Sequence, residues 1–195
     1  PAAVYISALG KVPDAAKLLP NEWQSPGNKL VGVMHRCKSA AGTVVARHLG
    51  IKPNDVDAIW PNDHQKNLKI LETLQQDGQI KSGVPVGAGG VLTTLVRGVL
   101  ASGFGVVIEE PDRVASLFQE HRCAAIVEVS DGLDFSHLRD LPHISAVFDS
   151  PGHPWMHWPV GRIVDRPLEV LLSGENVLTD EAIAAWRDMY RKSLQ

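Results

Sequence analysis

The sequence of 195 residues contains few cysteines, no long apolar run and no surplus of positive charge. Its two cysteines, Cys37 and Cys123, are too few for a disulfide framework and form no C-x-x-C pair, which favours a reducing, cytoplasmic location. No apolar run approaches the ~20 residues of a membrane span, and the N-terminal residues lack the pattern of a secretory signal, so no membrane partner is expected. With 19 Lys and Arg against 22 Asp and Glu, no nucleic-acid partner is expected either.

The composition is that of an ordinary globular protein with a local excess of glycine. Apolar residues make up 44% and charged residues 21%, which is typical of one folded domain over residues 1–195. The 17 glycines are unevenly spread, because Gly87, Gly89 and Gly90 lie within one short segment. This cluster is the first place to look for a functional site.

Strand-like and helix-like segments alternate along the chain, which predicts an α/β domain or an α+β domain with a mixed sheet. The expected strands are 4–9, 29–34, 104–108, 124–129, 144–148 and 160–164. The expected helices are a short turn over 13–19, then 39–49, 62–76, 91–100, 112–120 and a last helix capped by Thr179. In helix 62–76, the apolar face is expected to hold Leu68, Leu71 and Leu74, with Ile70 beside them.

Residues 83–90 are expected to form a glycine-rich loop directly before the helix over 91–100. Glycine lets the backbone approach a ligand closely, and the free N–H groups at the start of a helix attract anions. One hypothesis is a phosphate site made by the backbone of Val86, Gly87, Ala88, Gly89 and Gly90. The other is a tight turn with close helix packing. The segment is neither a Walker loop nor a G-x-G-x-x-G dinucleotide fingerprint, which disfavours flavin or NAD binding.

Two other groups of residues were candidates for metal binding. His153 and His157 could share a metal on a helix, but the prolines at 154 and 159 oppose a helix, and on a strand the two histidines lie about 13 Å apart. An aromatic docking surface or a packed loop fits that segment better. The acidic pairs Glu109–Glu110 and Asp131/Asp134 are expected to lie in solvent and to cap turns or helices. No metal site is therefore expected.

The segment around Cys37 offers a weaker candidate. Arg36 and Lys38 flank the cysteine, and a cationic setting can lower the pKa of a thiol, but no glutaminase signature accompanies it. The small polar residues 39–43 could assist an anion site near these two cations. Close helix packing is the stronger explanation for them.

The run Val86-Gly87-Ala88-Gly89-Gly90 before an apolar helix resembles the His-Asp-Val-Gly-Ala-Gly-Gly-Leu loop of phosphoribosylformylglycinamidine synthases, ligases of purine biosynthesis. Residues 4–14, 27–33, 117–120 with 125–129, 159–164 and the helix of Trp186 resemble that family in the same order. The resemblance implies the C-terminal-like domain of the aminoimidazole ribonucleotide (AIR) synthase fold, a three-layer mixed sheet with helices. The family activity it implies is the ATP-driven conversion of formylglycinamide ribonucleotide to its amidine.

The chain departs from the family at Val84 and Pro85, which stand where the family has His-Asp. Valine cannot carry a proton and proline lacks even its backbone N–H, so no catalytic residue is expected here. The resemblance assigns ATP and magnesium to a partner N-terminal domain, and 195 residues leave no room for it or for a glutaminase domain. This chain alone is therefore expected to bind no cofactor.

Two interpretations follow from the resemblance. The chain is either a piece of the ligase or a stand-alone, non-enzymatic binding or assembly protein of the same fold. If a ligand binds, it is expected to be a ribonucleotide phosphate held by the backbone of residues 83–92. A domain shaped to cover a partner exposes an apolar patch when alone, so we expect a homo-oligomer or a complex with an ATP-binding domain.

Overall fold

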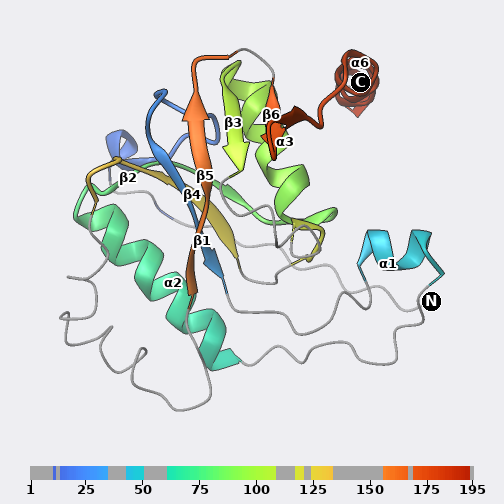
Figure 1. Ribbon diagram of the computed structural model, residues 1–195. Helices are drawn as coiled ribbons and strands as arrows, with labels where there is room; N and C mark the ends of the chain where they lie inside the picture. Colours follow the sequence, from blue (N-terminus) through green and yellow to red (C-terminus); the bar gives the residue numbers. More distant parts are fainter. Residues whose placement is uncertain are drawn as a thin grey trace.

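The computed structural model describes residues 11, 14–34, 43–50, 61–108, 117–120, 124–133, 156–166 and 169–193. Within these ranges, seven strands form one sheet in the order β2-β4-β1-β5-β3-β6-β7 (Figure 1). The strands are β1 (Lys29–Met34), β2 (Ile80–Pro85), β3 (Gly105–Ile108), β4 (Ala125–Val129), β5 (Met156–Val164), β6 (Val170–Leu172) and β7 (Glu175–Asn176). Neighbouring strands are antiparallel except β3 and β6, which are parallel. This mixed sheet confirms the expected fold class.

The described helices are α1 (Val44–His48), α2 (Pro61–Gln76), α3 (Gly90–Ser102) and α6 (Asp180–Ser193), with one 3-10 turn, η1 (Ala15–Lys17). Side-chain oxygens cap several of them, as sequence preference predicts. Asp14 accepts from the Ala16 amide at η1, Thr43 from Ala46 at α1, and Thr179 from Ala182 at α6. The predicted cap at Thr179 is therefore confirmed.

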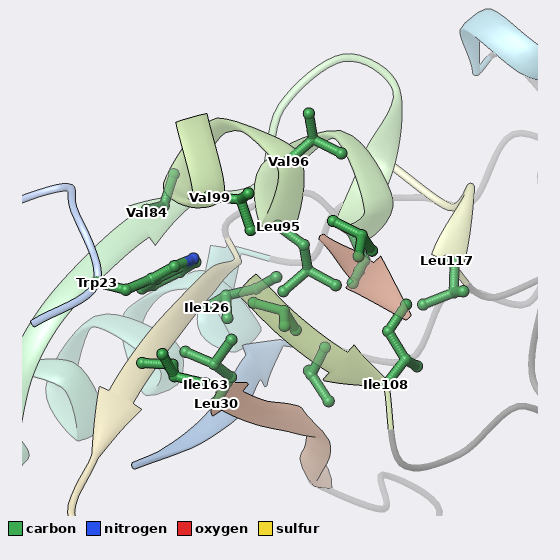
Figure 2. Close-up of a cluster of buried hydrophobic side chains, with 14 of the residues drawn as sticks. Trp23, Leu30, Val84, Leu95, Val96, Val99, Ile108, Leu117, Ile126 and Ile163 are labelled. Carbon is green, nitrogen blue, oxygen red and sulfur yellow. The ribbon is translucent and has the colours of Figure 1, made fainter. Parts of the chain in front are cut away.

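Apolar side chains on the two faces of the sheet form two separate clusters, which gives the domain three layers. One cluster packs against α3 and includes Leu30 and Ile126 of the central strands (Figure 2). The other packs against α2 and includes Val31 and Val127. Successive side chains of a strand point to opposite faces, so neighbours in sequence join different clusters.

Most of the expected elements in the described ranges are present. The strands at 29–34, 104–108 and 124–129 and the helices at 62–76 and 91–100 are confirmed within two residues at each end. The helix expected at 39–49 is described from Val44 to His48. The strands expected at 4–9 and 144–148, and residues 112–116 of the expected helix at 112–120, lie outside the described residues; in the described part of that helix, only Leu117 is helical.

Three strand predictions need correction. Residues 83–85, expected in a loop, are the end of β2, where an edge position tolerates Pro85. Strand β5 begins at Met156 rather than at 160, and it accommodates Pro159 next to a bulge, because Val31 pairs with Pro159 and Leu30 with Gly161. The hairpin of β6 and β7 was not expected; its two-residue turn, Ser173-Gly174, has positive φ at both positions.

The apolar face of α2 also differs from the expectation. Ile70 and Leu74 are buried, but Leu68 is 52% exposed. A three-residue step falls about 60° short of a full helical turn, so the 68, 71, 74 series drifts off the face that points to the sheet. Asn67 takes the buried position instead. Among the helices of the described ranges, none is long and apolar enough to cross a membrane.

Candidate functional site

The glycine-rich turn joins the end of β2 to the start of α3. The Val86 amide donates to the Ala124 carbonyl at 2.9 Å, which continues the pairing of β2 with β4. The Gly90 amide donates to the Gly87 carbonyl at 3.0 Å and closes the turn. Gly87 and Ala88 are exposed, whereas Gly90 is buried. The tip of the turn is thus open to solvent while its base is part of the fold.

The structural requirement for glycine differs among the three glycines of the turn. Gly90 has φ +74°, and a Cβ there would lie 2.6 Å from the Gln119 carbonyl oxygen. Gly89 also needs a left-handed backbone, with φ +83°. Gly87 has no positive φ, and a Cβ there would meet nothing within 4 Å. Helix packing therefore accounts for Gly90 and backbone conformation for Gly89, but neither accounts for Gly87.

An oxyanion of the protein itself lies on this turn. The Oε1 atom of Glu120 accepts a hydrogen bond from the Gly89 amide at 2.9 Å and another from the Val44 amide at 2.7 Å. Among the described residues, no hydrogen-bond partner is seen for the amides of Gly87 and Ala88. The five candidate residues therefore divide into two amides used by the fold, one held by Glu120 and two that are open.

Sequence reasoning missed Glu120, which lies 31 positions from Gly89. It was expected to end a helix, and no local pattern connects it with the turn. Thr43, in the small polar segment considered for anion binding, instead caps α1 through the Ala46 amide. Residues 39–42, together with Arg36, Cys37 and Lys38, lie outside the described residues.

The two positions that match the family's His-Asp face different surroundings. The Val84 side chain is 1% exposed and belongs to the cluster between the sheet and α3 (Figure 2). Pro85 is exposed at the end of β2. Position 84 therefore contributes to the core.

A second polar cluster, also missed from sequence, surrounds the buried carboxylate of Glu128 in β4. Its Oε2 accepts from the Gln24 amide at 2.7 Å and from Ser82 Oγ at 2.6 Å. Its Oε1 accepts from the Ser25 amide at 3.1 Å and from Asn28 Nδ2 at 2.6 Å. Three of these bonds fasten the segment before β1 to β4 and the fourth joins β4 to β2, so the cluster is structural.

The acidic residue Asp131 lies in an exposed ion-pair cluster. Arg162 Nη1 is 2.9 Å and Lys29 Nζ is 3.3 Å from its Oδ1. The hydrogen bond from Arg162, followed by that from Lys29, lowers the pKa of Asp131 below its usual value. This agrees with the expected solvated turn.

Residues proposed as possible metal ligands are mostly beyond the described ranges. Asp134, Glu109, Glu110 and His153 lie outside them, and only the backbone of His157 is described, within β5. Within the ranges that are described, no group of three or more His, Cys, Asp or Glu could hold a metal ion. The described part of the chain therefore offers no such cluster for magnesium, and no step of the proposal below is routed through magnesium.

Comparison with curated proteins finds two similar sequences, both named phosphoribosylformylglycinamidine synthase subunit PurL. The protein of a Nocardioides species is 28% identical over 133 residues, which is 65% of this chain and 17% of that protein. The protein of Leifsonia xyli is 29% identical over 149 residues, which is 69% of this chain and 19% of that protein. The chain therefore spans less than a fifth of the curated relatives it matches. No family model matches the chain.

Solved structures of PurL from Thermotoga maritima share the fold. The complex with FGAR has a TM-score of 0.60 at 16% identity and covers 84% of this chain and 28% of that one. The complex with ATP gives 0.58 at 16% identity, covering 84% and 26%, and the PurLQS structure gives 0.56 at 15% identity, also covering 84% and 26%.

Proposed function

We propose that this chain, which resembles PurL in sequence and shares its fold, is a domain or homologue of phosphoribosylformylglycinamidine synthase that holds a ribonucleotide phosphate on its glycine-rich turn. The observation that carries the proposal is the oxyanion of Glu120 on the Gly89 amide, next to two exposed amides without a partner in the described chain. Because the Gly89 amide donates to a carboxylate, this turn is an environment in which negative charge is stabilised.

The physical basis of phosphate binding would be backbone donors at the start of α3. The amides of Gly87 and Ala88 are exposed at the tip of the turn, and the N-terminal end of a helix carries partial positive charge. Gly87 adds a further argument, because neither its φ nor its packing requires glycine. Close approach of a ligand to the backbone is a remaining reason for glycine there.

In this proposal the chain positions a substrate and leaves the chemistry to other parts of the enzyme. Val84 is buried in the core and Pro85 has no backbone N–H, so neither can move a proton at the turn. ATP, magnesium and the glutamine-derived ammonia of the family reaction would be handled elsewhere in a complete enzyme. A stand-alone binding or assembly protein is the second candidate, favoured by the lack of a proton-carrying side chain at Val84 and Pro85.

The proposal is tested by calorimetric titration of the chain with ribose 5-phosphate, AMP and ATP, using Gly87→Ala and Gly132→Ala as a matched pair. Both glycines lack a positive φ, and a Cβ at either would meet nothing within 4 Å, so neither variant should lose stability. We expect Gly87→Ala to weaken phosphate binding about tenfold or more, because the methyl group would separate a charge-assisted donor from its acceptor. Gly132→Ala should bind like the parent chain. Absence of binding by the parent chain, or equal binding by both variants, would refute the site.

A further inference from the structure

The Glu120 carboxylate connects two parts of the chain that are far apart in sequence. One oxygen, Oε1, accepts from the Gly89 amide before α3 and from the Val44 amide at the first residue of α1. The side chain is only partly buried, so solvent and ligands can reach it. The carboxylate is therefore a contact that can be broken without opening the core.

A phosphate and this carboxylate would compete for the same turn. The Gly89 amide has one proton to donate, and Glu120 already accepts it. A phosphate on the neighbouring amides of Gly87 and Ala88 would also meet the negative charge of the carboxylate at short range, which is unfavourable. Full use of the turn by a phosphate requires Glu120 to leave.

We propose that Glu120 is an internal competitor of the phosphate, and that its displacement releases the start of α1. The inference rests on the proposed phosphate site and adds a regulatory contact to it. Because the same oxygen holds Gly89 and Val44, a ligand that moves the carboxylate away from the turn also disturbs its bond to Val44. Helix α1 has only five residues, too few to be stable alone, so losing this bond loosens its first turn.

The first test measures the affinity for inorganic phosphate and ribose 5-phosphate in Glu120→Ala, Glu120→Gln and the control Glu175→Gln, an exposed glutamate of β7. We expect Glu120→Ala to bind about tenfold or more tightly than the parent chain, because no carboxylate has to be displaced. Glu120→Gln should fall between the two, since its amide oxygen still accepts but carries no charge. The control should match the parent chain.

The outcomes separate the two hypotheses. If the parent chain and Glu120→Ala bind phosphate equally, the phosphate site stands and the competition is wrong. If neither binds although both unfold cooperatively, the proposed site itself is wrong, and the competition falls with it.

The second test uses the parent chain alone and so does not depend on a variant that folds. Hydrogen exchange of the Val44 amide should speed up about tenfold or more when phosphate saturates the chain, because its acceptor has moved away. The Ala46 amide, which donates to Thr43, serves as the internal reference and should change less. Phosphate binding without any change at Val44 would overturn the coupling to α1.

Discussion

Glu128 depends on its surroundings more than any other carboxylate in the described core. It is fully buried, and its four hydrogen-bond donors are all neutral groups: two backbone amides, an asparagine and a serine. A buried carboxylate is tolerated only when its oxygens are well satisfied. Its four bonds tie residues 24–28 to β4 and β2, so this side chain fixes the path of the chain into β1.

We expect Glu128→Gln to lower the free energy of unfolding by about 1–3 kcal/mol, despite its nearly identical shape. Each carboxylate oxygen faces a backbone N–H, from Gln24 or from Ser25, so either orientation of the new amide points its NH₂ at another donor. Urea denaturation measures the change. Glu175→Gln, at an exposed site, is the control and should stay within about 0.5 kcal/mol of the parent chain. Equal stability of both variants would show that the network is dispensable.

Asp131, in contrast, is exposed, and its contribution to the stability of the fold depends on pH. Hydrogen bonds from Arg162 and then Lys29 lower its pKa in the folded state from the ordinary value of 3.8. The ionised group therefore stabilises the fold above pH 3.8, and this contribution is lost as the pH falls from there through the lowered pKa. Denaturation at about pH 6, 4 and 3 should show a shallower acid loss of stability in Asp131→Asn than in the parent chain. Parallel pH curves would contradict this assignment.

At the scale of elements, one extra residue in β2 decides which face of the sheet is covered by the side chains that precede the candidate loop. Ile80 pairs with Val129 and Ser82 with Glu128, so Lys81 is the additional residue of a bulge. A bulge moves the following side chains to the other face of the sheet. Ile80 accordingly packs on the α2 side, and Val84 on the α3 side.

This geometry predicts different effects for the two substitutions that would restore the family's residues. Val84→His should destabilise the chain by about 2–4 kcal/mol, because it places a polar ring in the packed core. Pro85→Asp, at an exposed position, should cost less than about 1 kcal/mol, mainly through the lost rigidity of proline. Thermal unfolding of each single variant distinguishes them. A stable Val84→His protein would mean that position 84 can turn out of the core.

Elements with a clear local period could be predicted from the sequence, whereas features set by contacts between distant segments could not. Helix α3, with its helical spacing of apolar residues, and strand β1, with its continuous apolar run, are predicted correctly because each pattern lies within the element itself. The β6–β7 hairpin turns at Ser173-Gly174, where both residues have positive φ. Its strands are only three and two residues long, so they carry no periodic pattern from which the hairpin could be predicted. Glu120 and Glu128 bond to groups 31 to 104 positions away, and no local pattern announces such partners.

The whole chain corresponds to a part of its relatives. It spans 17% and 19% of the curated PurL proteins and 26–28% of the PurL chains with the same fold. Surfaces that contact other domains in a longer protein face solvent when the domain is alone. Within the described ranges, Leu18, Leu49 and Leu68 are 59%, 66% and 52% exposed. Each of these leucines lies in or next to a separate element and offers exposed apolar area that another molecule can cover.

We therefore expect the isolated chain to self-associate, with a sedimentation coefficient that rises with concentration. Replacing Leu18, Leu49 and Leu68 together by glutamate should shift the chain toward monomer, because the change removes exposed apolar area and makes the net charge of -3 more negative. The matched control replaces three exposed polar residues, Asn21, Gln65 and Ser130, by glutamate. It adds the same charge without removing apolar area, so it separates the two causes. Association that falls equally in both variants would point to charge alone, and a parent chain that stays monomeric at every concentration would rule out the self-associating surface.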